Sequence, residues 1–328
     1  EFLVKNKVSL KNLCDYLEDK NDASFIKRVI HKLIDNNILY INDNVPQYEC
    51  KKTVYIAVTK NCNLMCKHCS YSSEDEREFS LGEMENVVDK VLQSDPKHIV
   101  ITGGEPLFRE DIYAIITYLR TNFSGPLGLM TNGLLITNKN VDFIIKNFTT
   151  IDISIDGVDE ETCSNIRGPG VFRKVIDAIL LLQCHGFKEI SVSMVLVGDN
   201  FAVLNEFYKL CERLYVKPII RSFLPMGRGK INYDTLTKST KDVPQIGYKS
   251  DQIYLKACCC EAGYGMVFID PKGDIYPCNL LVQEQFRIAN IMDCDFLLAD
   301  FFKKREFQKT ASRNNLEQLF REVPCGCS

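Results

Sequence analysis

Residues 53–69 read TVYIAVTKNCNLMCKHC, and this stretch determines how the rest of the chain is interpreted. Its first part, Val54–Val58, is a short apolar run of the kind that forms a buried strand. Directly after it, Cys62, Cys66 and Cys69 fall within eight residues. Thiolates at this spacing can ligate three irons of a cubane iron–sulfur cluster and leave the fourth iron open. The alternative is a structural zinc site, but such a site usually takes four protein ligands.

The sequence that follows alternates between strand-like and helix-like segments. Strands are predicted at Val54–Val58, His98–Thr102, Gly128–Thr131, Ile151–Ile155, Ile190–Val197 and Pro218–Leu224. Helices are predicted at Leu81–Gln93, Arg109–Asn122, Asn138–Asn147, Phe172–His185 and Phe201–Leu214, the first with a capping box of Ser80 and Glu83. This alternation predicts an α/β fold with a parallel sheet, its strands buried on both faces. Because about 190 residues are too few for an eight-unit barrel, we expect a partial (β/α)6 barrel over residues 52–235.

A second motif, Gly103-Gly104-Glu105-Pro106, comes directly after the second predicted strand. Two glycines allow a ligand to approach the backbone closely, and a glutamate can accept hydrogen bonds from an ammonium group. In isolation the four residues are equally well explained as a plain turn. Their place at the carboxyl end of a barrel strand, where such folds carry their chemistry, favours a binding site.

The two motifs together resemble the radical S-adenosylmethionine (SAM) enzymes, over about Lys52 to Gly229. The resemblance rests on Cys-x-x-x-Cys-x-x-Cys, with His68 before the last cysteine, followed by Gly-Gly-Glu-Pro. It implies that Cys62, Cys66 and Cys69 bind a [4Fe–4S] cluster whose open iron chelates the amino and carboxylate groups of SAM. It also implies that Gly103, Gly104 and Glu105 receive the SAM amino group.

The resemblance implies further SAM contacts at the ends of later strands. Thr131 and Asn132 match a motif at the cofactor rim, and Ser154 and Asp156 stand where the ribose or carboxylate is often met. Arg167 is placed like an arginine that holds the SAM carboxylate. For each of these residues the alternative is a barrel-end turn or a helix cap.

Residues 236–328 are predicted to form a separate extension. Asn232–Asp251 is polar and loop-like, Gly265–Ile269 and Asp274–Pro277 flank a Pro-Lys-Gly turn, and a helix is expected near Leu297–Thr310. Cys260, twelve residues, Gly273, four residues and Cys278 resemble the start of the SPASM and Twitch extensions of the superfamily. Cys325 and Cys327 would complete four ligands for one auxiliary [4Fe–4S] or [2Fe–2S] cluster. A structural zinc site is the alternative.

Residues 1–47 are predicted to form a small helical unit, with two amphipathic helices and a short strand. This order resembles part of the winged-helix, PqqD-like element that binds leader peptides in enzymes that modify ribosomally made peptides. A helical appendage that only packs on the main domain is the alternative. The sequence opens on Glu1 rather than Met, so we expect further residues upstream.

Composition excludes several classes of protein. A net charge of −3 disfavours a nucleic-acid binder, and no apolar run approaches a membrane span. The 15 cysteines, with no export signal at the N-terminus, indicate a reducing cytoplasm with thiolates used as metal ligands.

The sequence therefore predicts a radical SAM enzyme that modifies a leader-bearing precursor peptide, with a flavodoxin or ferredoxin as electron donor. Thioether or another crosslink is the expected product, with epimerisation and sulfatase maturation as alternatives. A molybdopterin-type enzyme of small-molecule cofactor biosynthesis is the alternative of another class, and a non-enzymatic iron–sulfur or zinc module is a third. The sequence indicates no catalytic acid, base or hydrogen donor.

Overall fold

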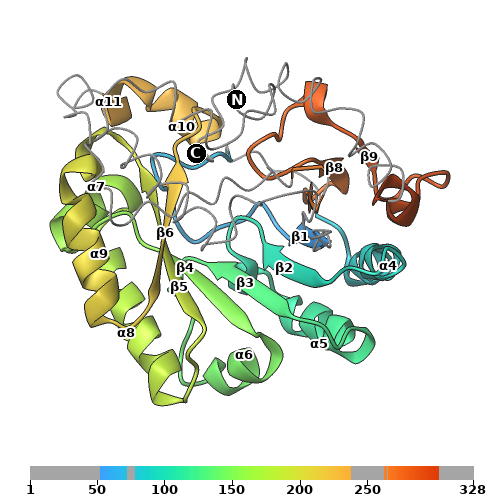
Figure 1. Ribbon diagram of the computed structural model, residues 1–328, viewed down its shortest axis with the longest axis horizontal. Helices are drawn as coiled ribbons and strands as arrows, with labels where there is room; N and C mark the ends of the chain where they lie inside the picture. The colour runs from blue at the N-terminus through green and yellow to red at the C-terminus, as the bar shows by residue number, and fades with distance from the viewer. Residues whose placement is uncertain (1–51, 72–77, 238–261, 264, 303–328) are drawn as a thin grey trace, which may run out of the picture. The chain divides into compact units, whose positions relative to one another are not determined.

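The computed structural model describes residues 52–71, 78–237, 262–263 and 265–302, all within one compact unit of the chain (Figure 1). The predicted unit at residues 1–47 lies outside the described residues. So do Cys260, Cys325 and Cys327.

Six parallel strands form the main part of a single open sheet. They are β1 (Thr53–Ala57), β2 (His98–Thr102), β3 (Leu127–Thr131), β4 (Thr150–Ser154), β5 (Ile190–Leu196) and β6 (Lys217–Ser222). Each pairs in parallel with the next in sequence. All six predicted strands are confirmed to within a few residues, and so is the mostly parallel α/β fold.

The sheet continues beyond β1 into the C-terminal hairpin. Strand β7 (Met266–Ile269) pairs in parallel with β1, while β8 (Asp274–Tyr276) and β9 (Ala289–Asn290) follow antiparallel. Asp270 Oδ1 closes the predicted turn by accepting from the amides of Lys272 and Asp274, both at 2.9 Å. The predicted hairpin is therefore confirmed, and its first strand shares the barrel sheet.

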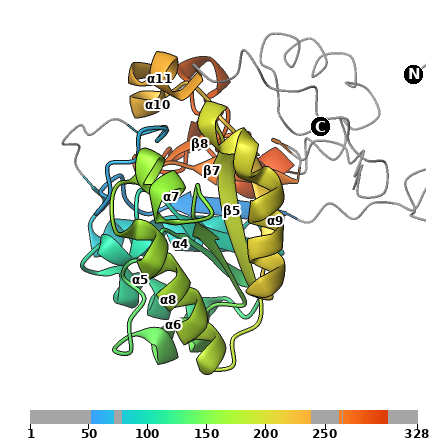
Figure 2. The same ribbon diagram turned by 90° about the vertical axis from the view of Figure 1, so that its left-hand side faces the viewer.

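Helices connect the strands and cover the outside of the sheet (Figures 1 and 2). They are α4 (Leu81–Leu92), α5 (Ile112–Asn122), α6 (Val141–Asn147), α8 (Val171–Cys184) and α9 (Leu204–Arg213). The predicted capping box of α4 is confirmed, since Ser80 and Glu83 bond each other's backbone amides. No helix within the described ranges has the length and apolar character needed to cross a bilayer.

Three further helices were not predicted. They are α7 (Glu160–Arg167), α10 (Gly227–Ile231) and α11 (Tyr233–Thr237). Helix α11 occupies the start of the segment that we expected to be a loop from Asn232, so that expectation is wrong for these residues. Helices α10 and α11 lie together at one end of the molecule in both views (Figures 1 and 2), at the end to which β6 leads.

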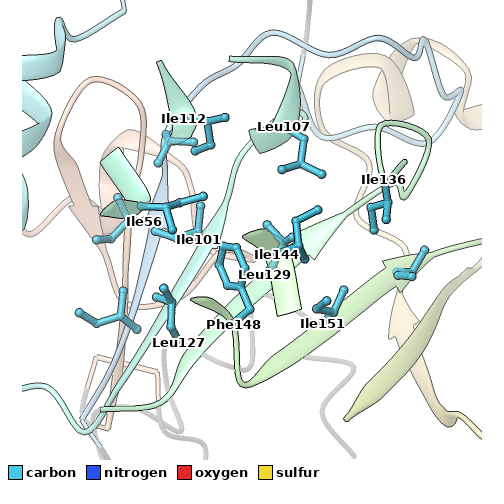
Figure 3. Close-up of a cluster of buried hydrophobic side chains, with 14 of the residues drawn as sticks. Ile56, Ile101, Leu107, Ile112, Leu127, Leu129, Ile136, Ile144, Phe148 and Ile151 are labelled. Carbon is cyan, nitrogen blue, oxygen red and sulfur yellow. The ribbon is translucent and has the colours of Figure 1, made fainter. Parts of the chain in front are cut away.

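The two faces of the sheet differ in chemistry. Ile56, Ile101 and Leu129 belong to the apolar cluster under the helices and are almost completely buried (Figure 3). Side chains alternate along a strand, so their neighbours point to the other face. That face carries polar groups, among them an ion pair between Asp152 on β4 and Arg221 on β6. Burial on both faces is thus confirmed for most residues of β1 to β5 but not for β6, which has no fully buried residue, and the second face is the more polar of the two.

Candidate functional site

A cavity of about 570 Å³ lies at the carboxyl ends of the strands. Cys62, Cys66 and Cys69 all line it. Of the other predicted site residues, the same cavity is lined by His68, Gly103, Gly104, Thr131, Asn132, Ser154 and Arg167. Glu105 and Asp156 are fully buried and do not line it. The structure therefore brings most of the predicted site together around the cysteine loop, residues 59–71.

Gly103 and Gly104 let the cysteine loop pack onto the end of β2. The Gly104 amide donates to the Thr59 carbonyl at 2.8 Å, and the Glu105 amide donates to the Asn61 carbonyl at 2.9 Å. A Cβ atom at Gly104 would lie 2.3 Å from the Asn61 oxygen. We expected these glycines to admit a ligand; the structure shows that they admit the backbone just before Cys62.

Substitution Gly104→Ala is therefore expected to displace the cysteine loop. Its Cβ would meet the carbonyl oxygens of Asn61 and Lys60 at 2.3 and 2.5 Å, and backbone atoms cannot swing aside as side chains do. Overpacking of this kind costs about 1–3 kcal/mol of unfolding free energy, which urea denaturation of the cluster-free protein measures. Iron uptake should fall as well.

The matched control for that variant is Gly82→Ala in helix α4, where nothing lies within 4 Å of the new Cβ. It should raise stability by about 0.5–1 kcal/mol, because alanine loses less backbone entropy than glycine in a helix. A Gly104→Ala protein as stable as the wild type would show that the loop does not depend on this close approach.

Helix α10 holds the other end of the cysteine loop, a role that our sequence reasoning missed. The Gly229 amide donates to the Cys69 carbonyl at 3.0 Å, and Arg228 Nε donates to the Cys66 carbonyl at 3.2 Å. Gly227 has a φ of 50°, and a Cβ there would lie 2.3 Å from the Ser70 oxygen. The signal was present as Gly227-Arg228-Gly229, a few residues after the sixth strand.

Glu105 ties the ends of β2 and β3 together from a position that is 0% exposed. Its carboxylate accepts from Thr131 Oγ1 and the Asn132 amide at 2.7 Å each, and from the Leu107 amide at 3.1 Å. Burial raises the pKa of this carboxyl, and the three hydrogen bonds oppose that rise. Its donors all come from the protein, so Glu105 acts here as a brace for the cavity wall.

Asn132 links this brace to the cysteine loop. Its side-chain amide donates to Asn63 Oδ1 at 2.7 Å and lies 3.8 Å from Cys62 Sγ. An amide donor near the sulfur is a common means of stabilising a metal-bound thiolate. The predicted rim residue is thus in contact with the cysteine loop itself.

Asp156 holds two other residues of the cavity lining in place, His68 and Arg167. It is 0% exposed, has a left-handed φ of 62°, and accepts from the Val195 amide at 2.7 Å. Its carboxylate also pairs with His68 Nε2, and with Arg167 Nε at 2.6 Å. Burial alone would raise the pKa of Asp156, but Arg167, His68 and the Val195 amide together lower it. The aspartate therefore remains ionised and fixes two side chains that line the cavity.

Arg167 connects Asp156 to the cysteine loop. It is the last residue of α7, and its Nη1 lies 3.9 Å from Cys66 Sγ. Burial would lower the pKa of this guanidinium, but Asp156 and the nearby thiols raise it. A permanent positive charge thus stands beside one of the predicted cluster ligands.

Burial disfavours the thiolate form of Cys62 and Cys66 when no metal is bound. Burial raises the pKa of Cys62 to about 11, although the Leu64 amide donates to its sulfur at 3.4 Å. Burial also raises the pKa of Cys66, and Arg167 opposes the rise. Metal ligation by these residues must therefore release protons.

Cys62, Cys66 and Cys69 fit an iron–sulfur cluster that is held by three sulfurs. All three line a cavity with room beside them, and Arg167 supplies positive charge close to one thiol. Within residues 52–71, 78–237 and 265–302, no three Cys, His, Asp or Glu side chains converge as the ligands of one metal ion do. The cysteines thus share a cavity rather than a single-ion site.

The predicted auxiliary site is described only at Cys278, which follows β8. Its side chain is buried with Ala262 and Leu281. The other three predicted ligands lie outside the described residues, so the auxiliary cluster stays a prediction.

Comparison with known proteins finds relatives whose names indicate different activities. Mycofactocin maturase MftC of Mycolicibacterium smegmatis is 28% identical in an alignment 259 residues long, which covers 72% of this chain and 66% of that protein. The chain thus spans just under two thirds of that relative. AdoMet-dependent heme synthase of Oleidesulfovibrio alaskensis is 28% identical over 293 residues, covering 76% of this chain and 74% of that protein.

Among solved structures, Streptococcus suis SuiB bound to precursor peptide SuiA superposes with a TM-score of 0.59. The match covers 92% of this chain and 76% of that chain at 16% identity, and shows a shared fold. The family model described as the Radical SAM superfamily matches residues 56–211. This match spans β1 to α9 and includes the three-cysteine loop. The chain therefore contains a radical SAM superfamily domain over residues 56–211.

Proposed function

We propose that this protein is a radical SAM enzyme that cleaves SAM reductively and modifies a ribosomally made precursor peptide. The observation that carries the proposal is that Cys62, Cys66 and Cys69 line one cavity with the ends of β2, β3 and β4. The relationship to a mycofactocin maturase supports a peptide as the substrate.

In this proposal Cys62, Cys66 and Cys69 hold a [4Fe–4S] cluster and the remaining cavity holds SAM. When bound and reduced, the cluster would supply the electron for reductive cleavage of SAM, and that cleavage would provide the means to take a hydrogen atom from the substrate. Arg167 is held in the wall by Asp156 and is suited to bind a carboxylate. Ser154, Thr131 and Asn132 present polar groups to the same space.

In this proposal the chain's own residues orient the side chains that line the cavity and hold the cysteine loop in place. Asp156 keeps His68 and Arg167 in place, while Glu105 fixes the ends of β2 and β3. Helix α10 anchors the cysteine loop from the side of β6. A site fixed by so many internal bonds needs little rearrangement when its cofactors bind.

We further propose one auxiliary cluster, Twitch-like, on Cys260, Cys278, Cys325 and Cys327. Within the described residues, the Gly263 amide donates to the Pro277 carbonyl at 2.9 Å. This bond holds the segment just before β7 next to the residue that precedes Cys278, which supports the proposal. Such a cluster would accept an electron from the substrate radical or bind a substrate thiol.

Residues 1–47 are proposed to bind the leader of the precursor peptide, and a flavodoxin or ferredoxin to donate electrons. Thioether or another crosslink is the proposed product. The relationship to an AdoMet-dependent heme synthase favours a small-molecule substrate as the second candidate. Peptide epimerisation and sulfatase maturation use a similar set of parts.

The experiment that separates these candidates is deletion of residues 1–47. Reconstituted, reduced protein with SAM should still form 5′-deoxyadenosine slowly, because the cysteine loop lies outside the deletion. Turnover of a leader-bearing peptide encoded beside the gene should fall about tenfold or more in kcat/KM, because remote binding energy positions the reacting carbon. Mass spectrometry of the peptide then identifies the product.

A crosslink lowers the peptide mass by two hydrogens, whereas epimerisation in heavy water changes it only by deuterium uptake. The leader peptide added separately should not rescue the truncated protein. Full peptide turnover after the deletion would refute leader binding by this segment and favour a leader-independent or small-molecule enzyme.

A further inference from the structure

A second cavity, of about 250 Å³, adjoins the cysteine cavity. Lys60, Tyr71 and Asn279 line both spaces, as do Gly103 and Met130. The second cavity extends toward the β7–β8 hairpin, from which Phe268 and Asp270 line it. A group held there would therefore stand next to the site proposed for the cluster and SAM.

Aromatic rings form much of the wall of this cavity. Tyr55 comes from β1, Tyr71 from the end of the cysteine loop, and Phe268 from β7. Tyr55 and Phe268 pack together in a small apolar cluster. Such walls favour a flat or apolar group, since ring faces pack well against other rings and hydrocarbon.

Asp270 places a carboxylate beside these rings. The residue is 7% exposed, and its Oδ1 already accepts the two turn amides of Lys272 and Asp274. No residue in the described part of the chain donates a hydrogen bond to Oδ2. This oxygen is therefore available to a hydrogen-bond donor of a ligand that enters the cavity.

The charges that line the cavity decide which donor fits. Asp270 and Lys60 are the charged residues in the described lining, so their charges offset each other. Burial raises the pKa of Asp270, and the nearby Asp274 charge adds to the rise; the two backbone hydrogen bonds and the Lys60 charge oppose it without cancelling it. A cation entering the cavity would face Lys60, whereas an uncharged donor would not.

We infer that this cavity binds a side chain of the substrate that has an aromatic or apolar body and ends in an uncharged hydrogen-bond donor. Asp270 Oδ2 accepts that hydrogen bond and so determines which side chain is held beside the cysteine cavity. The inference rests on the proposed function, because it places a substrate next to the radical-forming site.

The test uses three fragments of similar shape with the full-length, reconstituted protein and SAM, without reductant. Benzyl alcohol carries an uncharged donor, benzyl methyl ether carries none, and benzylamine carries a positive charge. Ligand-observed NMR titration should show benzyl alcohol binding most tightly. Asp270→Asn retains Oδ1 for the turn but replaces Oδ2 by a donor. It should weaken benzyl alcohol about tenfold and leave benzyl methyl ether unchanged.

Asp274→Asn is the matched control, because it changes the same hairpin but does not line the cavity. It should leave all three affinities unchanged. Val282→Trp fills the cavity without touching the turn and should abolish binding of both uncharged fragments, which keeps the test decisive if Asp270→Asn does not fold.

Equal binding of benzyl alcohol to wild type and Asp270→Asn would overturn the inference. So would tighter binding of benzylamine, or no binding of any fragment to the wild type. Because no reductant is present, these results do not depend on SAM cleavage. Failure of the proposed function would be seen separately, as absence of 5′-deoxyadenosine from the reduced wild type.

Discussion

Replacement of Cys62, Cys66 and Cys69 by alanine is expected to remove roughly four irons per chain and to reduce 5′-deoxyadenosine formation to background. The three side chains line one cavity, and no other cysteine of the described residues lines it. A cubane that loses all its thiolates has no protein ligand left there. Iron and sulfide analysis after anaerobic reconstitution measures the first effect, and chromatography of the reduced reaction with SAM measures the second.

Two comparisons make this result specific. A Cys184→Ala, Cys294→Ala double variant changes exposed thiols away from the cavity and should retain full iron and activity. If the auxiliary cluster exists, the triple variant keeps the iron beyond one cubane, and adding Cys278→Ala removes it. Undiminished SAM cleavage by the triple variant would refute the assignment of the cysteine loop, and zinc in place of the excess iron would refute the auxiliary cluster.

Asp156→Asn should destabilise the cluster-free protein by about 3–5 kcal/mol, because it leaves Arg167 buried without its ion-pair partner. Asparagine tolerates the left-handed φ of 62° at this position, so the backbone is retained while the charge is lost. SAM affinity should also fall, since Arg167 and His68 lose their common anchor. Urea unfolding measures the first effect, and equilibrium binding of SAM to the reconstituted protein measures the second.

Asp95→Asn is the matched control, since Asp95 also has a left-handed φ, of 52°, but pairs with Lys97 on the surface. Its unfolding midpoint should stay at the wild-type value, as exposed ion pairs contribute little. Equal midpoints for Asp156→Asn and Asp95→Asn would show that the buried pair is not a stabilising contact.

The sequence predicted the strands well because their signal is local. Six short apolar runs, most of them rich in β-branched residues, alternate with amphipathic helices and leave few alternatives to a parallel sheet. The turn residues Asp270–Gly273 likewise predict the hairpin. Helix α7 was missed because it has just two apolar side chains, Cys163 and Ile166. Both are buried, but two positions are too few to show a helical period. Its start is marked by Asp159 and Thr162, a weaker form of the capping box than Ser80 and Glu83.

The site was predictable as a set of residues but less so as a set of roles. Motif positions identified Glu105, Asp156 and Arg167, yet nothing local shows that Glu105 bonds β3 or that Asp156 pairs with both His68 and Arg167. The same holds for Arg228, whose contact with the Cys66 carbonyl joins segments far apart in the chain. Such roles depend on which segments meet in space, and a single sequence does not encode that in any short pattern.

The pairing of β7 with β1 has a consequence for how the chain is made. Strand β1 precedes the cysteine loop, and one of its edges stays open until Met266–Ile269 has been synthesised, roughly 200 residues later. During translation this edge offers unpaired backbone groups to any other extended chain. Ribosome-bound intermediates are therefore expected to be vulnerable to aggregation until the hairpin emerges, and stable insertion of iron should come after that moment rather than with the appearance of the cysteines.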